Sequence, residues 1–548
     1  MSTLNFNIGV LGHVDSGKTS LAKALSTVAS TACFDKNPQS KQRGITLDLG
    51  FSSFTIQSNE ILQKNGYDFV QYTLVDCPGH ASLIKTIIGG AQIIDMMLLV
   101  IDITKGIQTQ TAECLIIGEI CCNKMLIVLN KLDLIEPDKR SSAVEKMSKR
   151  LSKTLENTKF ANSPIVSVAA SLPINENEKE NQESEKSMLN MDLLINKLKE
   201  ITFLPERNEQ NGPFLYSVDH CFTVKGQGTV MTGTILNGNV KVNDTVEIPI
   251  LKCKNKVKSI QVFRKPVDKA IQGDRCGICL ANFDSKQFER GFVCSPGYVK
   301  NSYAVIIELK KIRHFKSKIE SMSKFHISIG HETLLAKIEL FSTESDDDNF
   351  NMSNEYLHVP EIDQEFLDQK GKNFKVYALI DFSTDSTNDQ GVLCVDDSLL
   401  IGSKLDTDIH LNQCRIAFYG RILHSFTNKE FKANDLPSLK VYKEKSREGV
   451  VERKHDEFTI IGKSLFKKET NMDLFVGLKV KLSTGDEGVI ESGFGQSGKF
   501  KIRIQNGLSQ TLKDSLDKKT GSSQSNGPVK IILNFKRFIY DDKKKMSQ

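Results

Sequence analysis

The 548-residue chain carries a net charge of +6, with 39% hydrophobic and 26% charged residues. This composition is that of a folded soluble protein, and the length predicts three or four domains. The longest apolar stretch, Ile84 to Ile103, contains Lys85, Asp95 and Asp102, so we expect neither a membrane span nor a membrane partner. No basic segment precedes an apolar run at the start of the chain, and we therefore expect a cytoplasmic protein, with room for a nuclear pool.

Twelve cysteines are spread along the whole sequence. In a chain of this size they predict free thiols in a reducing compartment. Cys276-Gly-Ile-Cys279 has half the spacing of a zinc site, but no second Cys or His pair follows it. The alternation around it favours a strand with buried thiols.

The N-terminal part of the chain alternates apolar runs with helix-length segments. Each run is bounded by glycine, proline or charge, and the runs are Asn5–Leu11, Phe69–Asp76, Met96–Ile103 and Met125–Asn130. This pattern predicts a parallel sheet covered by helices on both faces. The tract Asn175–Lys186 is almost wholly polar and should form a surface insert.

The composition and the pattern of apolar residues change after Leu204-Pro205. Short runs rich in Val, Ile and Thr, separated by glycines, fill Pro213–Ser295 and predict a small β-barrel. Similar runs continue to Leu439, with polar loops near Ser342–Glu355 and Ser383–Gln390. A further β-rich stretch begins at Lys440. Its many lysines and arginines favour either nucleic-acid binding or a solvated surface, and charge alone does not decide between them.

The first apolar run leads directly into a P-loop. In this setting the backbone N–H groups and the helix N-terminus that follows cradle phosphate oxygens. Lys18 should reach the β- and γ-phosphates, and the Thr19 hydroxyl should ligate Mg²⁺. The predicted phosphate-binding residues are Gly12, His13, Val14, Asp15, Ser16, Gly17, Lys18, Thr19 and Ser20.

The identity of the base follows from Asn130-Lys131-Leu132-Asp133, which comes after an apolar strand and so lies at the carboxyl end of the sheet. The Asp133 carboxylate can accept from both the ring N–H and the exocyclic amine of guanine. Adenine offers neither donor there and would leave the acid unpaired. We therefore predict GTP and GDP as ligands, with Asn130, Lys131 and Asp133 at the guanine site.

Two loops between these motifs predict the residues that sense the γ-phosphate and the residue that catalyses GTP hydrolysis. Asp76-Cys-Pro-Gly79 places Asp76 at Mg²⁺ and the Gly79 N–H at the γ-phosphate. Thr46, in Arg43-Gly-Ile-Thr46, could close over Mg²⁺. We assign His80 as the catalytic residue that orients the attacking water, against the alternative that it only packs or is solvated. Because no arginine finger is evident, turnover should depend on a partner.

Taken together, these motifs resemble those of the translational GTPases, and Lys225–Gly233 resembles the start of their second domain. The chain is more closely similar to the eukaryotic selenocysteine-specific elongation factors. That resemblance spans all four domains and departs mainly in the polar inserts. It is carried by Gly44–Gly50, Asp76–Ile94, Ser217–Phe222, Phe325–Glu332, Ile401–His410 and Ser464–Asn471.

The resemblance implies an α/β P-loop GTPase domain at 1–204, followed by three β-rich, barrel-like domains at 213–296, 297–439 and 440–548. The guanine loop of such proteins usually reads Ser-Ala. It corresponds here to Ser167-Val-Ala-Ala170, which places the contact at Ala169 or Ala170.

The resemblance further implies that Asp219, His220 and Arg275 line a pocket for the selenocysteyl group, although any of them could be an ordinary surface charge. A selenol is much more acidic than a thiol, whose reference pKa is about 8.5, so it is ionised at neutral pH. Arg275 stays charged, His220 can donate beside it, and Asp219 can fix the geometry.

A charge-assisted hydrogen bond contributes about 1.5–3 kcal/mol, which would not exclude abundant seryl-tRNA. The tRNA body should therefore be read as well, by the third and fourth domains. The candidate cations are Lys463, Lys467, Lys468, Lys499, Lys501 and Arg503.

The function implied is GTP-dependent delivery of selenocysteyl-tRNA to the ribosome at in-frame UGA codons. A protein bound to the selenocysteine insertion element of the mRNA would assist, and the factor would act as a monomer. Two alternatives stay open. A general elongation factor would leave the stretch after Lys440 unexplained, and a GTP-binding initiation-factor subunit has no assigned role for Arg275 beside His220.

Overall fold

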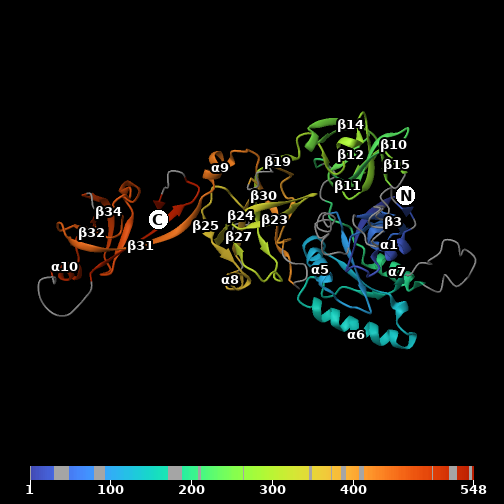
Figure 1. The fold of residues 1–548 in the computed structure, drawn as a ribbon, viewed down its shortest axis with the longest axis horizontal. Helices are drawn as coiled ribbons and strands as arrows, with labels where there is room; N and C mark the ends of the chain where they lie inside the picture. The colour runs from blue at the N-terminus through green and yellow to red at the C-terminus, as the bar shows by residue number, and fades with distance from the viewer. Residues whose placement is uncertain are drawn as a thin grey trace, which may run out of the picture. The chain divides into compact units, whose positions relative to one another are not determined.

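The computed structural model describes most of the chain, which divides into two compact units, residues 1–338 with 379–427 and residues 339–378 with 428–548 (Figure 1). The described residues are 2–26, 28–29, 49–78, 93–170, 188–207, 212–262, 265–344, 349–371, 373–383, 391–406, 413–495, 498–517, 528–541 and 546–548. The polar tract Asn175–Lys186 and the predicted site residues Thr46, Gly79 and His80 lie outside them. The four domain boundaries stay predictions.

Within the described residues, a seven-stranded sheet with the order β2-β3-β4-β1-β5-β6-β7 forms the centre of the N-terminal domain. The strands are β1 Thr3–Leu11, β2 Val28–Ala29, β3 Gly50–Gln57, β4 Phe69–Asp76, β5 Met96–Asp102, β6 Met125–Asn130 and β7 Ile165–Ser167. In the sheet order β4-β1-β5-β6-β7, each strand is parallel to its neighbour. This confirms the prediction for the four apolar runs, which form β1, β4, β5 and β6.

The parallel arrangement predicted from the four apolar runs does not extend to one edge of the sheet. Strand β3 runs antiparallel to β4, and β2 runs antiparallel to β3. The link between β3 and β4 contains only the five-residue helix α3 (Glu60–Lys64). A link of this kind suits an antiparallel pair, whereas parallel strands need a longer crossover.

Helices cover both faces of this sheet. Helices α1 (Lys18–Leu25) and α7 (Met191–Ile201) pack on the face formed by Phe6 and Ile8 of β1. On the other face, Gly118 of α5 (Thr109–Cys121) lies against the Met97 sulfur of β5. The longest of these helices is α6 (Pro137–Leu155). Among the described residues, no helix is both long enough and apolar enough to cross a membrane.

The next strands close into a barrel, called the first barrel below, with the order β13-β18-β10-β11-β17-β14 and a β13–β14 pairing. They are β10 Leu215–Val224, β11 Gly228–Asn237, β13 Thr245–Ile248, β14 Cys253–Val262, β17 Arg275–Leu280 and β18 Gly291–Cys294, with β12 Asn239–Lys241, β15 Lys265–Val267 and β16 Lys269–Ile271 beside them. Cys276 and Cys279 are buried on β17, as predicted, and all cysteines that the structure describes are free.

A second set of strands follows the first barrel. In the first unit, β29 lies between β23 and β30, β20 pairs with β30, and β23 pairs with β24. Strand β24 continues to Glu344, so the polar loop predicted from Ser342 begins later than expected. The bounds are β19 Lys300–Ser302, β20 Ala304–Glu308, β21 Lys310–Lys311, β22 Ile319–Glu320, β23 Lys324–Ile329, β24 Glu332–Glu344, β25 Tyr356–Val359, β26 Glu361–Ile362, α8 Gln364–Asp368, β27 Phe374–Asp381, β28 Val392–Cys394, β29 Leu399–Ser403, β30 Ile416–Phe426 and α9 Phe431–Asn434.

The C-terminal strands form a closed barrel, called the C-terminal barrel below, with the order β31-β32-β35-β34-β33-β36 and a β31–β36 pairing. Its core includes the buried side chains of Phe500, Ile531 and Leu533. The elements are β31 Val441–Lys454, β32 Thr459–Lys463, β33 Lys479–Leu482, β34 Glu487–Phe494, β35 Lys499–Arg503, α10 Gln510–Asp517, β36 Lys530–Phe538 and β37 Met546–Ser547. An α/β P-loop domain followed by β-rich domains is thus confirmed as the fold class.

One buried ion pair joins the N-terminal domain to the strands after the first barrel. Arg415, next to β30, donates from Nε and Nη2 to the two carboxylate oxygens of Glu113 on α5, at 2.8 and 2.9 Å. Both side chains are buried. A bidentate pair of this kind satisfies both groups, and removal of one partner leaves a buried charge uncompensated.

We therefore expect Arg415→Met to lower the free energy of unfolding by about 3–5 kcal/mol. The matched control is Arg421→Met, because Arg421 pairs with Asp397 at 3.0 Å with both side chains exposed; its effect should stay below about 1 kcal/mol. Urea denaturation measures both. Equal midpoints for the two variants would contradict the structural role of the Arg415 pair.

Candidate nucleotide and aminoacyl sites

The phosphate loop takes a shape that only glycine allows at two positions. Gly12 has φ +151°, and a Cβ there would lie 2.2 Å from the Val100 carbonyl oxygen. Gly17 has φ +89°, and its Cβ would lie 2.1 Å from Asn130 Nδ2. Helix α1 begins at Lys18, directly after the loop. The loop N–H groups and the positive end of the helix dipole thus meet where an anion would bind.

Lys18 lies in this loop with its side chain buried. Its Nζ donates to the His13 carbonyl oxygen at 2.7 Å. Burial lowers the pKa of Lys18, while the nearby Asp76 carboxylate acts in the opposite direction. Burial and the Lys18 charge also lower the pKa of His13. The ammonium group is therefore held by one loop carbonyl, and a phosphate oxygen would be a stronger partner for it.

The two described residues predicted to hold Mg²⁺ lie together. Thr19 Oγ1 donates to Asp76 Oδ2 at 2.6 Å, and Asp76 is buried at the end of β4. A hydroxyl and a carboxylate are the hard oxygen donors that Mg²⁺ prefers. Nearby in the loop, the buried Ser16 Oγ has no hydrogen-bond partner among the described residues. The donor set fits the ion.

Asn130 of the predicted guanine-site motif braces the phosphate loop. Asn130 Nδ2 donates to Ser16 O at 3.0 Å, and Asn130 Oδ1 accepts from the Ala170 N–H at 3.2 Å. Lys131 has φ +66° and its Nζ lies 2.9 Å from Asp102. Asp133 is exposed and available to a ligand.

Both predicted alanines are buried on β8 (Ala169–Ala170), which pairs with β9 (Met188–Leu189). Of the two, Ala170 donates its N–H to Asn130.

The remaining residues predicted to bind phosphate lie in the loop or at the start of α1. The Val14 N–H donates to Gln110 Oε1 at 3.3 Å, and Asp15 is exposed with φ +60°. Ser20 follows Thr19 on α1. The roles of all these residues toward a nucleotide stay predictions.

We expect Gly17→Ala to weaken GTP binding by about 50-fold or more, because the Cβ forces Asn130 away and the positive φ is unfavourable for alanine. Gly66→Ala is the matched control, since Gly66 has φ +87° with nothing within 4 Å of its Cβ. Titration with a fluorescent GTP analogue measures both. Normal binding by Gly17→Ala would show that the Asn130 contact does not shape the loop.

The residues predicted for the aminoacyl pocket lie on neighbouring strands of the first barrel. The pairing of β10 with β11 shifts between Val218 and His220, so Asp219 is the extra residue of a β-bulge. A bulge redirects a side chain out of the regular alternation. Arg275 Nη1 donates to Asp219 Oδ2 at 2.6 Å, while His220 lies opposite Thr232. The structure thus brings Asp219 and Arg275 together, and His220 follows Asp219 directly on β10.

Arg275 is unusual because its guanidinium is buried, at 4% exposure, yet only partly hydrogen-bonded. Besides Asp219, its Nη1 lies 3.5 Å from Thr234 Oγ1, and its Nη2 has no hydrogen-bond partner among the described residues. The guanidinium stacks on the ring of Phe51 from β3, with 3.1 Å between the guanidinium carbon and the ring centroid. A buried cation with a spare donor is suited to an anionic ligand.

Sequence reasoning missed His331, which follows β23 and so comes from beyond the first barrel. Its Nε2 lies 2.8 Å from Ser217 Oγ, two residues before Asp219. Burial lowers the pKa of His331, and the Asp219 charge acts in the opposite direction. The segment Phe325–Glu332 carries part of the family resemblance, but no spacing in the sequence links it to β10.

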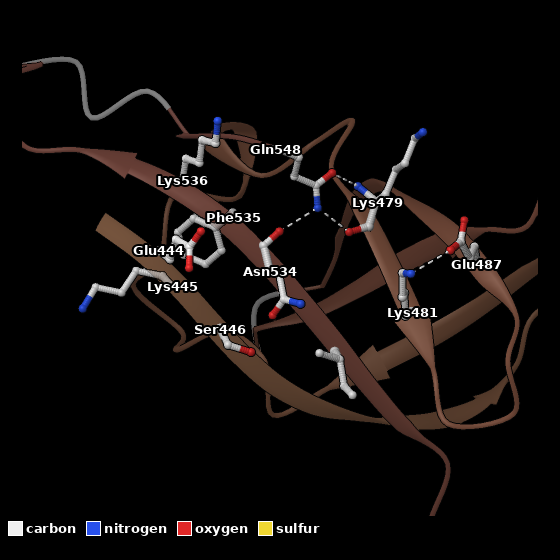
Figure 2. Close-up of a pocket in the computed structure, with 11 residues that line it drawn as sticks. Glu444, Lys445, Ser446, Lys479, Lys481, Glu487, Asn534, Phe535, Lys536 and Gln548 are labelled. Atoms are coloured by element: carbon white, nitrogen blue, oxygen red, sulfur yellow. Dashed lines mark hydrogen bonds and ion pairs between the residues drawn. The ribbon is translucent and has the colours of Figure 1, made fainter. Parts of the chain in front are cut away.

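The C-terminal barrel carries a cavity of about 630 Å³. Figure 2 shows Gln548 bridging two strands at its rim. Gln548 exchanges hydrogen bonds with the backbone of Lys479 and donates to Asn534 O. Four of its lining residues are lysines, whereas two are acidic. The lysines are Lys445, Lys479, Lys481 and Lys536, and the acids are Glu444 and Glu487.

The cations singled out from sequence lie elsewhere on this barrel. Lys499 and Lys463 share Glu452 at 2.8 and 3.8 Å, and Arg503 lies 3.4 Å from Glu491. Lys501 Nζ lies 5.8 Å from the Phe494 ring. Lys467 and Lys468 are exposed before the η7 turn (Met472–Leu474). Three of the six are therefore partly neutralised, and sequence reasoning missed the cavity lysines because their proximity depends on strand pairing.

A P-loop, a guanine-type motif and a following barrel define a GTPase of the translation-factor class. The family models agree: residues 4–216 match the elongation factor Tu GTP binding domain and residues 228–295 match elongation factor Tu domain 2. Residues 306–420 match the third domain of the eukaryotic selenocysteine-specific elongation factor, and residues 437–544 match the eEFSec C-terminal RIFT domain.

The chain belongs to the selenocysteine-specific elongation factor family. It is 48% identical to the selenocysteine-specific elongation factor of Mus musculus, with 100% of this chain and 99% of the relative aligned. It is 32% identical to that of Methanocaldococcus jannaschii, over 94% and 98% of the two chains. The crystal structure of elongation factor SelB from Methanococcus maripaludis with the GTP analogue GppNHp superposes with a TM-score of 0.65, at 25% identity, over 98% of this chain and 100% of that one.

Proposed function

We propose that this GTP-dependent elongation factor binds selenocysteyl-tRNA and delivers it to the ribosome at in-frame UGA codons. The observation that carries the proposal is the buried Arg275 guanidinium, whose Nη2 group has no hydrogen-bond partner within the part of the chain that the structure describes. A selenol is more acidic than a thiol and so carries a negative charge at neutral pH, whereas the serine hydroxyl of the precursor is neutral. A fixed, desolvated cation therefore favours the selenocysteyl group.

The nucleotide step assigns a role to each loop residue. Lys18 would leave the His13 carbonyl for the β- and γ-phosphates, and Thr19, Asp76 and Thr46 would hold Mg²⁺. The bound ion neutralises charge on the phosphate oxygens. The Gly79 N–H would contact the γ-phosphate, and His80 would orient the attacking water. The 2.6 Å contact between Thr19 and Asp76 supports this arrangement.

Recognition of the aminoacyl group needs support from the tRNA body. One charge-assisted hydrogen bond gives about a tenfold to 150-fold preference, which is small beside the excess of other tRNAs. The lysines of the C-terminal barrel cavity are suited to RNA phosphates, because RNA helices are recognised mainly through shape and backbone contacts. In this proposal they bind the tRNA backbone, together with the exposed Lys467 and Lys468.

The remaining partners follow from the family. Docking on the ribosome would align His80 and trigger hydrolysis, which releases the tRNA. A protein bound to the selenocysteine insertion element of the mRNA would bring the factor to its codon. We propose that the factor acts as a monomer in the cytoplasm, with a nuclear pool.

Filter binding with selenocysteyl-, seryl- and methionyl-tRNA in the presence of a GTP analogue tests this function. Preferential retention of selenocysteyl-tRNA is expected. Equal retention of seryl- and selenocysteyl-tRNA would indicate a general elongation factor, and preference for methionyl-tRNA would indicate an initiation-factor subunit.

We expect Arg275→Ala to weaken selenocysteyl-tRNA binding by about tenfold to 150-fold, because a charge-assisted hydrogen bond is lost. Affinity for seryl-tRNA and for GTP should stay within about twofold, since the charge acts only on an ionised ligand. Lys269→Ala, which removes an exposed cation from the same barrel, is the control. Loss of GTP binding in Arg275→Ala would mean that the residue serves the nucleotide site instead.

Removal of two cavity lysines should weaken all tRNA binding without changing the aminoacyl preference. Each phosphate contact contributes about 0.7–0.9 to the magnitude of the slope of log affinity against log salt, so Lys445→Ala combined with Lys479→Ala should lower that magnitude by about 1.4–1.8. Lys530→Ala is the control, because the Lys530 ammonium lies outside the cavity and pairs with Glu448 at 3.6 Å. An unchanged slope in the double variant would exclude the cavity as an RNA contact.

A further inference from the structure

A hairpin from the second set of strands ends against the surface of the first barrel. Ile329 of β23 pairs with Glu332 of β24, so Gly330 and His331 form the turn between them. A Cβ at Gly330 would lie 2.5 Å from the Phe292 ring, next to β10 on β18. The His331 ring centroid lies 5.6 Å from that of Phe292. The tip of this hairpin is therefore fitted closely to the barrel.

The hairpin tip meets one end of a row of side chains, and Arg275 is at the other end. Phe292 lies opposite Ser217 of β10, and Ser217 lies opposite Thr234 of β11. Thr234 in turn lies opposite Arg275 of β17, and its Oγ1 is 3.5 Å from Arg275 Nη1. Residues directly opposite one another in antiparallel strands point to the same face of the sheet. One face of the sheet thus connects the hairpin tip to the guanidinium.

His331 is hydrogen-bonded to this row at Ser217. Its Nε2 lies 2.8 Å from Ser217 Oγ, and Ser217 is buried. Ser217 lies two residues before Asp219, the extra residue of the β10 bulge. The direction of a bulged side chain depends on how the strand is held on either side of it. His331 therefore holds β10 on one side of the bulge that turns Asp219 toward Arg275.

The charge of the Asp219 carboxylate acts on both Arg275 and His331. Arg275 Nη1 donates to this carboxylate at 2.6 Å. Burial lowers the pKa of His331 and outweighs the opposing effect of the Asp219 charge, so the imidazole is neutral at neutral pH. A neutral ring can bond to Ser217 without competing with Arg275 for the carboxylate. Asp219 thus stays paired with Arg275.

We infer that His331 is a positioning residue for the aminoacyl site, which holds the β10 bulge through Ser217 and so fixes the Asp219–Arg275 pair toward the selenocysteyl group. The inference rests on the proposed function and adds to it a specificity-determining residue from outside the first barrel. Through this contact, the strands expected to read the tRNA body also shape the pocket for the aminoacyl group.

The test uses full-length His331→Leu, which keeps a bulky side chain but removes the hydrogen bond to Ser217. With a GTP analogue bound, the ratio of selenocysteyl-tRNA to seryl-tRNA affinity should fall about three- to tenfold, the effect of one buried hydrogen bond. His331→Gln can place its amide nitrogen near the position of Nε2, so it should retain the wild-type ratio within about twofold. GTP affinity should not change in either variant.

Two further variants keep the test independent of the folding of His331→Leu. Ser217→Ala removes the other partner of the hydrogen bond and should lower the ratio as much as His331→Leu does. His326→Leu is the matched control, because His326 lies on β23 of the same hairpin and its Nδ1 accepts from the Leu405 N–H at 3.3 Å. It should leave the ratio unchanged, even where it lowers thermal stability.

A second background separates positioning from direct contact with the ligand. If His331 acts through Arg275, His331→Leu should lower the ratio in the wild-type chain but not in the Arg275→Ala chain. A further loss in that background, or an equal loss in His326→Leu, would overturn the inference. If the wild-type chain does not distinguish selenocysteyl- from seryl-tRNA, the proposed function fails. If wild type and His331→Leu distinguish them equally, only the role of His331 fails.

Discussion

The burial of one guanidinium is the constraint on which the aminoacyl site depends. A cation taken out of water needs compensation, and Arg275 receives it from a single carboxylate at 2.6 Å and from the face of Phe51. The bulge in β10 turns Asp219 toward Arg275, and the turn at Gly273 is hydrogen-bonded to β1. The first barrel thus supplies the carboxylate that pairs with this charge, and the GTPase domain supplies the aromatic ring that covers it.

Comparison with a second buried arginine shows why Arg275 is suited to a ligand. Arg415 uses Nε and Nη2 on both oxygens of Glu113, a closed arrangement that serves to join two parts of the fold. Arg275 uses one edge on Asp219, and its Nη2 has no partner among the described residues. The first pair is a structural link, whereas the second is an incomplete one that an anion can complete.

Short sequence motifs were sufficient to predict those parts of the fold and of the candidate site that depend on neighbouring residues. The P-loop, the four parallel strands and the strand that carries Cys276 and Cys279 were all predictable, because each follows from a short motif or a local pattern of apolar residues. The antiparallel edge strand β3 was not, since its direction depends on the short link around α3. Phe51 and His331 were also missed, because their roles arise only from tertiary contacts. Asn130 was predicted at the base, and its bonds to Ser16 and Ala170 show that it also braces the phosphate loop.

Recognition at the aminoacyl site depends on a fixed cation that meets an ionised side chain. The most direct measurement is the pH dependence of selenocysteyl-tRNA affinity relative to seryl-tRNA affinity, with the full chain bound to a GTP analogue. Lowering the pH protonates the selenol and removes its charge, whereas the serine hydroxyl does not titrate in this range. We therefore expect the two affinities to converge as the pH falls. Parallel pH profiles for the two tRNAs would contradict recognition by charge.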